Sequence, residues 1–209
     1  MKFFKQFGIT NINYNNENEA AGNTYTTRDG ILEPTPLIFN DNPFNKNIKS
    51  AKNIFEIGFG VGRNVKWIME NTTANYYGVE PNEFMFNSFW KFNDEQYKDR
   101  INIFKDFSLL SNIKFDVVVS TFVLQHIGYM PPNDIMNVYD IATEIKKFTK
   151  RGTVWILLEH DSENDWINKF FTDMNIKPDV YIRGFKGIEL MTHRDHCTKD
   201  GHHLIIWKQ

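Results

Sequence analysis

The feature that most constrains this fold is an alternation of strand-like and helix-like segments between residues 53 and 175. Short apolar runs with β-branched and aromatic residues are typical of buried strands, and apolar residues three and four apart are typical of helices. The predicted strands are 53–58, 76–80, 101–105, 115–122 and 152–160, and the predicted helices are 61–72, 82–97, 133–150 and 163–175. Such alternation indicates parallel βαβ units with right-handed crossovers.

At the C-terminal end this alternation stops. Residues 180–193 and 202–209 are two strand-like segments, and the connection between them, residues 194–201, is too short for a helical crossover. The last two strands are therefore predicted to be antiparallel. The expected fold is α/β: a Rossmann-like, doubly wound, mostly parallel seven-stranded sheet with a C-terminal antiparallel hairpin.

The chain of 209 residues, 41% of them hydrophobic, is long enough to bury one sizeable core. Residues 1–50 begin with an Asn-rich stretch and contain Pro34, Pro36 and Pro43, which oppose regular helices. We interpret residues 1–50 as an N-terminal leader, and a possible lid over the active site, and residues 51–209 as the main domain.

Charge and cysteine usage narrow the classes of partner and compartment. The net charge of −2 and the isoelectric point near 6.3 give no overall basic excess, so nucleic acid is not the expected partner, although a local basic patch stays open. The single Cys197 favours a reducing cytoplasm, and no apolar run of membrane-spanning length is present. The sequence leaves the oligomeric state open.

A glycine-rich turn follows the first predicted strand. Gly58, Gly60 and Gly62 lie where the carboxyl end of a strand in an open α/β sheet meets a ligand. Arg63 occupies the position at which a dinucleotide-binding turn would need a small residue, so a pyrophosphate is disfavoured. Glu56, two residues before the first glycine, favours a ligand that carries positive charge.

The second predicted strand ends at Glu80, whose carboxylate is suited to accept hydrogen bonds from two ribose hydroxyls. The two acids and the turn together favour a nucleoside that carries a cation and no phosphate. S-adenosylmethionine is such a molecule.

In these motifs and in their order, residues 53–208 resemble the class I S-adenosylmethionine-dependent methyltransferases. The resemblance implies a cofactor, S-adenosyl-L-methionine, and a product, S-adenosyl-L-homocysteine. The first motif of the family implies cofactor-binding roles for Glu56, Gly58, Gly60 and Gly62, and Glu80 matches the acid that binds the ribose.

Further cofactor-binding positions are implied by the same resemblance. Asp106 matches the family position that accepts from the adenine amino group, with Phe107 beside the ring, although an Asp there is also typical of a cap. The fourth strand implies that Ser120, Thr121 and Phe122 line the cofactor. His126 then faces the substrate, or is simply an ordered histidine behind the strand.

Methyl transfer from a sulfonium needs mainly a nucleophile at near-attack distance. A hydroxyl or ammonium acceptor also needs a base, for which we name His126 and His160 as the candidate catalytic residues, with Glu159 and Asp161 as further possibilities. Carboxylate, thiolate or neutral amine acceptors need none. The segments outside the cofactor core are short, which favours an oxygen or nitrogen of a small molecule as acceptor. A protein or peptide acceptor, and a non-catalytic regulator that binds the cofactor, are the alternatives.

A histidine cluster marks the C-terminal hairpin, at positions 193, 196, 202 and 203, with Cys197 among them. These are residue types that bind zinc. His202 and His203 are adjacent on a predicted strand, however, so their side chains point to opposite faces and do not easily join one site. We expect no metal, and a polar hairpin at the mouth of the pocket.

Overall fold

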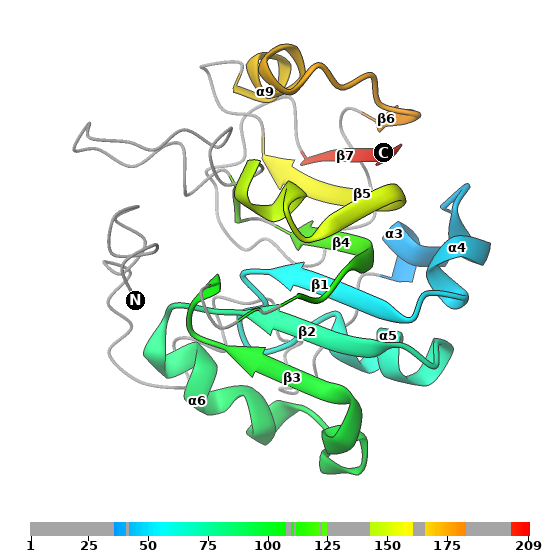
Figure 1. Cartoon of the computed structure of the whole chain (residues 1–209). Coiled ribbons are helices and arrows are strands. Elements are labelled where there is room, and N and C mark those ends of the chain that lie inside the picture. Colours follow the sequence, from blue (N-terminus) through cyan, green and yellow to red (C-terminus); the bar gives the residue numbers. More distant parts are fainter. Residues whose placement is uncertain are drawn as a thin grey trace.

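A computed structural model describes residues 36–40, 42–107, 110, 112–121, 123–124, 143–160, 166–182 and 202–209 (Figure 1). Its centre is one seven-stranded sheet with the order β3-β2-β1-β4-β5-β7-β6. The strands are β1 (Asn53–Ile57), β2 (Asn75–Val79), β3 (Ile101–Phe104), β4 (Phe115–Thr121), β5 (Thr149–His160), β6 (Val180–Ile182) and β7 (His202–Lys208).

The direction of the strands agrees with the sequence-based prediction. The pairs among β1 to β5 are parallel, whereas β7 runs antiparallel to both β5 and β6. The chain order reverses beside β1, so β1 and β4 lie at the switch point where α/β sheets bind their ligands. The predicted mostly parallel sheet with an antiparallel C-terminal end is confirmed.

Apolar side chains cover both faces of the sheet and form two cores. On one face Phe55, Trp155 and Trp207 pack with residues of α9 (Trp166–Met174), among them Phe170. On the other face Ile54 packs with α5 (Val65–Asn71). Alternate residues of a strand point to opposite faces, so neighbouring apolar residues such as Ile54 and Phe55 feed both cores. The sheet is therefore wound on both sides, as predicted.

Two short helices, α3 (Pro36–Asn40) and α4 (Asn45–Lys49), precede β1 and belong to the second core (Figure 1). Phe39 is fully buried and stacks on Trp67 of α5, with ring centroids 4.5 Å apart. This end of the N-terminal leader is therefore part of the packed structure. The lid was predicted over residues 1–50, of which 1–35 lie outside the described residues, so the lid stays a prediction.

The helix predicted at 82–97 is shorter in the structure. Helix α6 (Glu83–Phe92) ends before Asn93, whose extended backbone lets its side chain donate to the carbonyl oxygens of Val61 and Phe89 at 2.7 and 2.8 Å. A 3₁₀ helix, η2 (Glu95–Arg100), follows, capped by Asp94. A tertiary contact thus ends the helix earlier than its apolar periodicity suggests.

Most of the helix predicted at 133–150 lies outside the described residues. In the part that is described, residues 143–146 are helical. Its last two residues, Thr149 and Lys150, belong instead to β5, which begins before Gly152. Among the described residues, no helix has the length and apolar character needed to span a membrane.

Candidate functional site

The glycine-rich turn leaves the carboxyl end of β1 in a conformation that needs glycine. Gly58, Gly60 and Gly62 have φ angles of 63°, 61° and 91°, in the left-handed region. A Cβ atom on Gly58 would lie 2.5 Å from Cγ2 of Val123, which follows β4. The turn therefore brings bare backbone to the edge of the sheet and packs against the segment after β4.

Glu80, at the end of β2, is bonded to this turn. Its Oε2 accepts a hydrogen bond from the backbone N–H of Gly60 at 2.9 Å, and its Oε1 accepts one from Asn82 at 2.8 Å. Burial raises the pKa of Glu80 to about 7, although both N–H groups favour the charged form. Each carboxylate oxygen has two lone pairs, so both oxygens can still accept a ligand hydroxyl.

Glu56 is the centre of a buried polar network below the turn. Its two oxygens accept hydrogen bonds from the amide of Asn64 and the hydroxyl of Tyr76, each at 2.6 Å, and its side chain is buried. The same Asn64 amide lies 3.3 Å from Oγ1 of Thr121 on β4. Burial raises the pKa of Glu56 to about 7, and both hydrogen bonds and the charge of Arg63 oppose this rise.

Gly78 makes this network possible. It pairs with Glu56 across β1 and β2, and Tyr76 lies two residues earlier on the same face of β2. A Cβ atom on Gly78 would lie 2.9 Å from the Tyr76 hydroxyl and 2.6 Å from Cδ1 of Phe59, inside the turn. A bare α-carbon at this position therefore allows Tyr76 to reach Glu56.

The end of β4 is hydrogen-bonded to another buried carboxylate, Glu159. Oε1 of Glu159, on β5, accepts from the Ser120 hydroxyl at 2.8 Å and lies 3.3 and 3.2 Å from the backbone nitrogens of Val123 and Leu124. Glu159 is fully buried. Its contacts are those of a residue that holds the backbone after β4 in place, so the structure does not favour Glu159 as the general base.

The remaining predicted residues are placed as follows. Asp106 is buried and is the second residue after β3, whose Phe104 carbonyl accepts from the Glu80 N–H at 2.9 Å. Phe107 is buried in the first core, 5.6 Å from the ring of Phe55. Phe122 and His126 lie outside the described residues, and His160 is described only as a backbone position in β5. Their roles stay predictions.

The hairpin histidines are only partly described. His193, His196 and Cys197 lie outside the described residues, and His202 is described only as a backbone position. His203 is buried, and its Nδ1 lies 3.1 Å from the Tyr181 hydroxyl. Within the described part of the chain, no three His, Cys, Asp or Glu residues converge as a metal site would require.

The structure therefore brings the first-motif glycines, Glu80, Ser120 and Thr121 to one edge of the sheet. Tyr76 and Asn64 complete the network around Glu56 and were not predicted from the sequence. The sequence did contain one signal for this network, the Tyr-Tyr-Gly-Val-Glu stretch. It has a glycine, Gly78, which pairs with Glu56, and a tyrosine, Tyr76, two residues earlier on the same face of the strand. Two carboxylates at this edge favour a cationic, hydroxyl-bearing ligand over a phosphate.

Comparison with known proteins agrees with this geometry. Residues 55–157 match a family model described as a methyltransferase domain. The matched segment runs from β1 into β5 and contains the turn, Glu80 and the end of β4. No curated protein matches the chain.

Solved structures share the fold at low sequence identity. An S-adenosyl-L-methionine-dependent methyltransferase described as putative, from Methanococcus maripaludis, is 16% identical, with a TM-score of 0.61 and 95% of each chain covered. The magnesium protoporphyrin IX methyltransferase of Synechocystis is 15% identical, with a TM-score of 0.54 and coverage of 78% of this chain and 71% of that one. An RNA methyltransferase from Salinibacter ruber is 14% identical, with a TM-score of 0.50 and coverage of 84% and 91%.

Proposed function

We propose, from the premise that this chain belongs to the class I S-adenosylmethionine-dependent methyltransferases, that it methylates an oxygen or nitrogen atom of a small molecule. Its cofactor is S-adenosyl-L-methionine, and its product is S-adenosyl-L-homocysteine. The similar structures include a magnesium protoporphyrin IX methyltransferase and an RNA methyltransferase, so the acceptor has to be inferred from this chain.

The observation that carries the proposal is the bond between the turn and Glu80. One carboxylate fixes the Gly60 backbone and keeps one acceptor site on each oxygen for the two ribose hydroxyls. The positive φ angles of the turn require glycine, whose lack of a side chain allows the methionine part of the cofactor to approach the backbone closely. Asp106, at the end of the neighbouring β3, is in the matching position to accept from the adenine amino group.

Glu56 holds the turn from below in this proposal. Its side chain is buried in a network with Asn64 and Tyr76, so we assign it to the cofactor site through the turn it supports and through its negative charge. Ser120 and Thr121 line the same edge from β4. Phe107 is part of the core in the structure, and its contact with adenine stays a prediction.

The reaction is an in-line displacement. The acceptor lone pair forms a bond to the methyl carbon, the carbon–sulfur bond breaks, and its electron pair stays on sulfur as the sulfonium becomes a neutral thioether. When the acceptor is a hydroxyl or an ammonium, its proton passes to a base, for which His126 and His160 stay the candidates. Both positions follow or end strands whose carboxyl ends reach this edge.

The small-molecule acceptor rests on the lengths of the segments at the acceptor side. Outside the cofactor core, the segments that could contact an acceptor are residues 1–35, 122–142, 161–165 and 183–201. Each is shorter than the roughly 40 residues that a domain usually needs to fold alone. A protein or peptide acceptor is the second candidate, because short loops can also present a side chain to the methyl group.

Release of S-adenosyl-L-homocysteine tests the proposal directly. The purified protein should release it with a panel of small hydroxyl, amine and carboxylic acid compounds, and Glu80→Ala should reduce this release whereas Glu70→Ala, an exposed carboxylate on α5, should not. Release with peptides only would favour the second candidate. Cofactor binding with no release on any acceptor would favour a regulator and contradict the proposed activity.

A further inference from the structure

The end of the sheet opposite the glycine-rich turn is strongly basic. Eight exposed cations lie around the amino ends of β1, β4 and β5 and the final residues of β7: Lys46, Lys49, Lys52, Lys114, Lys147, Lys150, Arg151 and Lys208. We call this surface the basic edge. The described carboxylates that lie among these cations are Asp116, Glu144 and Asp179, although the whole chain has a net charge of −2. Positive charge is thus concentrated at this end.

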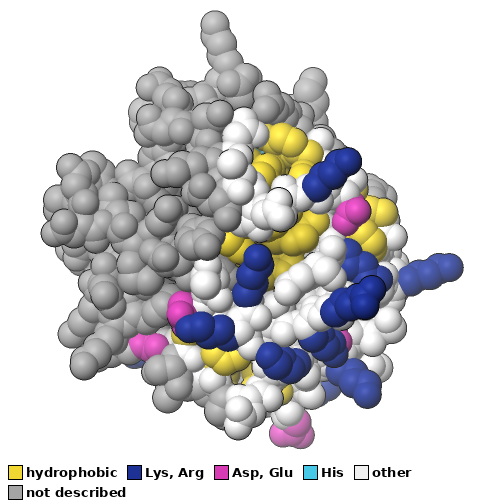
Figure 2. Space-filling model, turned by 45° about the horizontal axis from the view of Figure 1, so that its top comes forward, with side chains coloured by type: hydrophobic (Ala, Val, Ile, Leu, Met, Phe, Trp, Pro, Cys, Tyr) yellow, Lys and Arg dark blue, Asp and Glu magenta, His cyan; other side chains and the backbone are white. Residues whose placement is uncertain are grey.

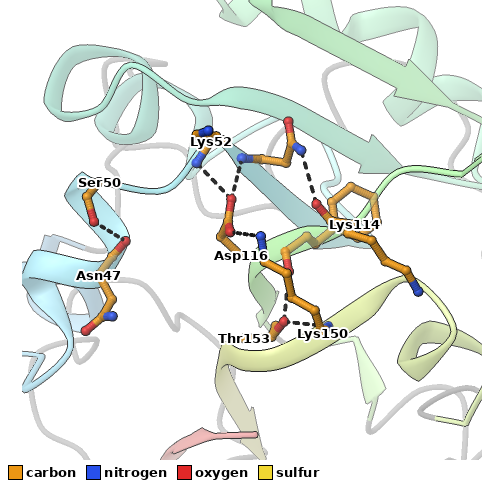
Figure 3. A network of polar contacts seen from close by, with 9 residues as sticks. Asn47, Ser50, Lys52, Lys114, Asp116, Lys150 and Thr153 are labelled. Atoms are coloured by element: carbon orange, nitrogen blue, oxygen red, sulfur yellow. Dashed lines mark hydrogen bonds and ion pairs between the residues drawn. The ribbon is translucent and has the colours of Figure 1, made fainter.

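The contacts at this surface show that the cations are neighbours (Figure 3). Asp116 accepts from the backbone N–H groups of Lys52 and Asn53 at 2.8 and 3.0 Å, and its other oxygen pairs with Lys150 Nζ at 2.5 Å. Lys114 Nζ donates to the carbonyl oxygen of Lys147 at 2.6 Å. Strand pairing places Lys208 beside Val154, next to the β4–β5 end.

Few of these cations are neutralised. Lys150 pairs with Asp116 and Lys147 with Glu144, and both carboxylates are thereby occupied. Within the described part of the chain, Lys49, Lys52 and Arg151 make no ion pair. Figure 2, whose right-hand side corresponds to the amino ends of the strands in Figure 1, shows dark blue side chains gathered there with few magenta ones between them.

We infer that the basic edge binds the phosphate backbone of a nucleic acid. Exposed lysines act as point charges that neutralise phosphates and release counterions, without reading base sequence. A protein partner fits less well, because protein interfaces are depleted in lysine and have an apolar centre. A membrane surface also fits less well. Among the described residues the large apolar side chain that is exposed is Phe84, on α6, far from this edge in sequence and fold, so none is available there for insertion.

This inference goes beyond methyl transfer and departs from the expectation of no nucleic-acid partner. The basic edge lies at the amino ends of the strands, whereas Gly58, Gly60 and Glu80 lie at the carboxyl ends. Binding there would tether the protein to a polyanion and leave the cofactor edge accessible. Loss of nucleic-acid binding and loss of cofactor binding are therefore separable results.

The probe is a fluorescein-labelled 20-nucleotide poly(U) RNA, whose weakly stacked bases make binding depend mainly on phosphate contacts. Binding is measured by fluorescence anisotropy at increasing salt concentrations. The test variant is K49Q/K52Q/R151Q. The matched control, K66Q/K91Q/K105Q, removes the same charge from α5, α6 and the residue after β3. Each contact to single-stranded nucleic acid contributes about 0.7 to the slope of log K against log salt.

We expect the control to keep the wild-type slope. The edge variant should reduce the slope by about 2 and weaken binding at least about tenfold at low salt. Both variants should keep the wild-type thermal midpoint and affinity for S-adenosyl-L-homocysteine. If the edge variant fails to fold, K46Q/K49Q on α4 replaces it.

Three results would overturn the inference. They are no measurable poly(U) binding by the wild type, equal losses in the edge and control variants, and edge-dependent binding that is tighter to phosphatidylserine vesicles or to polyglutamate than to RNA.

Discussion

At the scale of single residues, the site rests on two carboxylates that are both buried and both hydrogen-bonded. Glu56 and Glu80 follow the same rule, in which burial disfavours the charged form and donors from the protein partly restore it. Their donors differ. The side chains of Tyr76 and Asn64 serve Glu56, whereas the backbone N–H groups of Gly60 and Asn82 serve Glu80. Glu80 is thus bonded directly to the turn, whereas Glu56 is bonded to side chains beside it.

The stability of the ligand-free protein should depend on both carboxyls. Their pKa values rise from 4.5 to about 7 on folding, so the folded state holds more protons in that interval. Their contribution to stability is therefore fully present below pH about 4.5 and is lost as the pH rises through about 7. Thermal midpoints of the wild type, Glu56→Gln and Glu80→Gln between about pH 5 and pH 8 measure this. The wild type should lose stability relative to each variant, and parallel curves would refute the assignment.

Tyr76→Phe should destabilise the protein by about 1–3 kcal/mol, because it removes the hydroxyl that donates to the buried Glu56 and leaves one oxygen without that bond. Tyr77→Phe is the matched control. Tyr77 is the next residue of β2 and packs against Phe115 by its ring. Thermal or urea unfolding of the two variants gives the comparison, and equal stabilities would count against the network.

At the scale of elements, most of the strands were predictable because they are short apolar runs. The ends of the helices were less predictable. Asn93 ends α6 by bonding to the carbonyl of Val61, which lies in the turn and far away in sequence. Thr149 and Lys150 continued an apparent helix in sequence but belong to β5, where Thr149 pairs with Phe115 of β4. Such boundaries are set by tertiary contacts, which local periodicity does not contain.

Gly78→Ala should destabilise the fold by about 1–3 kcal/mol, which for a chain of this length lowers the thermal midpoint by roughly 2–12 °C. The added methyl would meet Phe59 at 2.6 Å and the Tyr76 hydroxyl at 2.9 Å. Since Phe59 lies between Gly58 and Gly60, cofactor affinity should fall as well. Calorimetric melting and titration with S-adenosyl-L-homocysteine test both effects, and a variant with wild-type values for both would show that the contact is not restrictive.

At the scale of the whole molecule, the sequence predicted the sheet and its C-terminal reversal but not the distribution of charge. The cations of the basic edge come from α4, the starts of three strands and the end of β7, which are separated by more than a hundred residues. Three of them, Lys147, Lys150 and Arg151, lie in the basic stretch 146–151, but the other five are scattered along the sequence, and the net charge of −2 gives no sign of them. The parallel arrangement of β1, β4 and β5 collects their amino ends at one side, and the antiparallel β7 ends beside them, which brings these cations together.

We expect deletions of the N-terminal leader to have different effects depending on whether they end before or after residue 36. Deleting residues 1–35 should leave the thermal midpoint within a few degrees and keep cofactor binding, but reduce turnover if these residues act as a lid. Deleting residues 1–40 also removes the fully buried Ile38 and Phe39, and should lower the midpoint by roughly 10 °C or more. Unchanged turnover after the shorter deletion would refute the lid, and equal midpoints would refute the packing role of α3.

The central claim is that Glu80 and the glycine-rich turn hold S-adenosyl-L-methionine, and isothermal titration with this cofactor tests it most directly. Glu80→Ala should weaken binding by about 1.5–3 kcal/mol through loss of a charge-assisted acceptor, while Glu70→Ala on α5 should bind as the wild type does. Unchanged affinity in a folded Glu80→Ala variant would contradict the claim, as would thermal stabilisation by a nicotinamide dinucleotide with none by S-adenosyl-L-homocysteine.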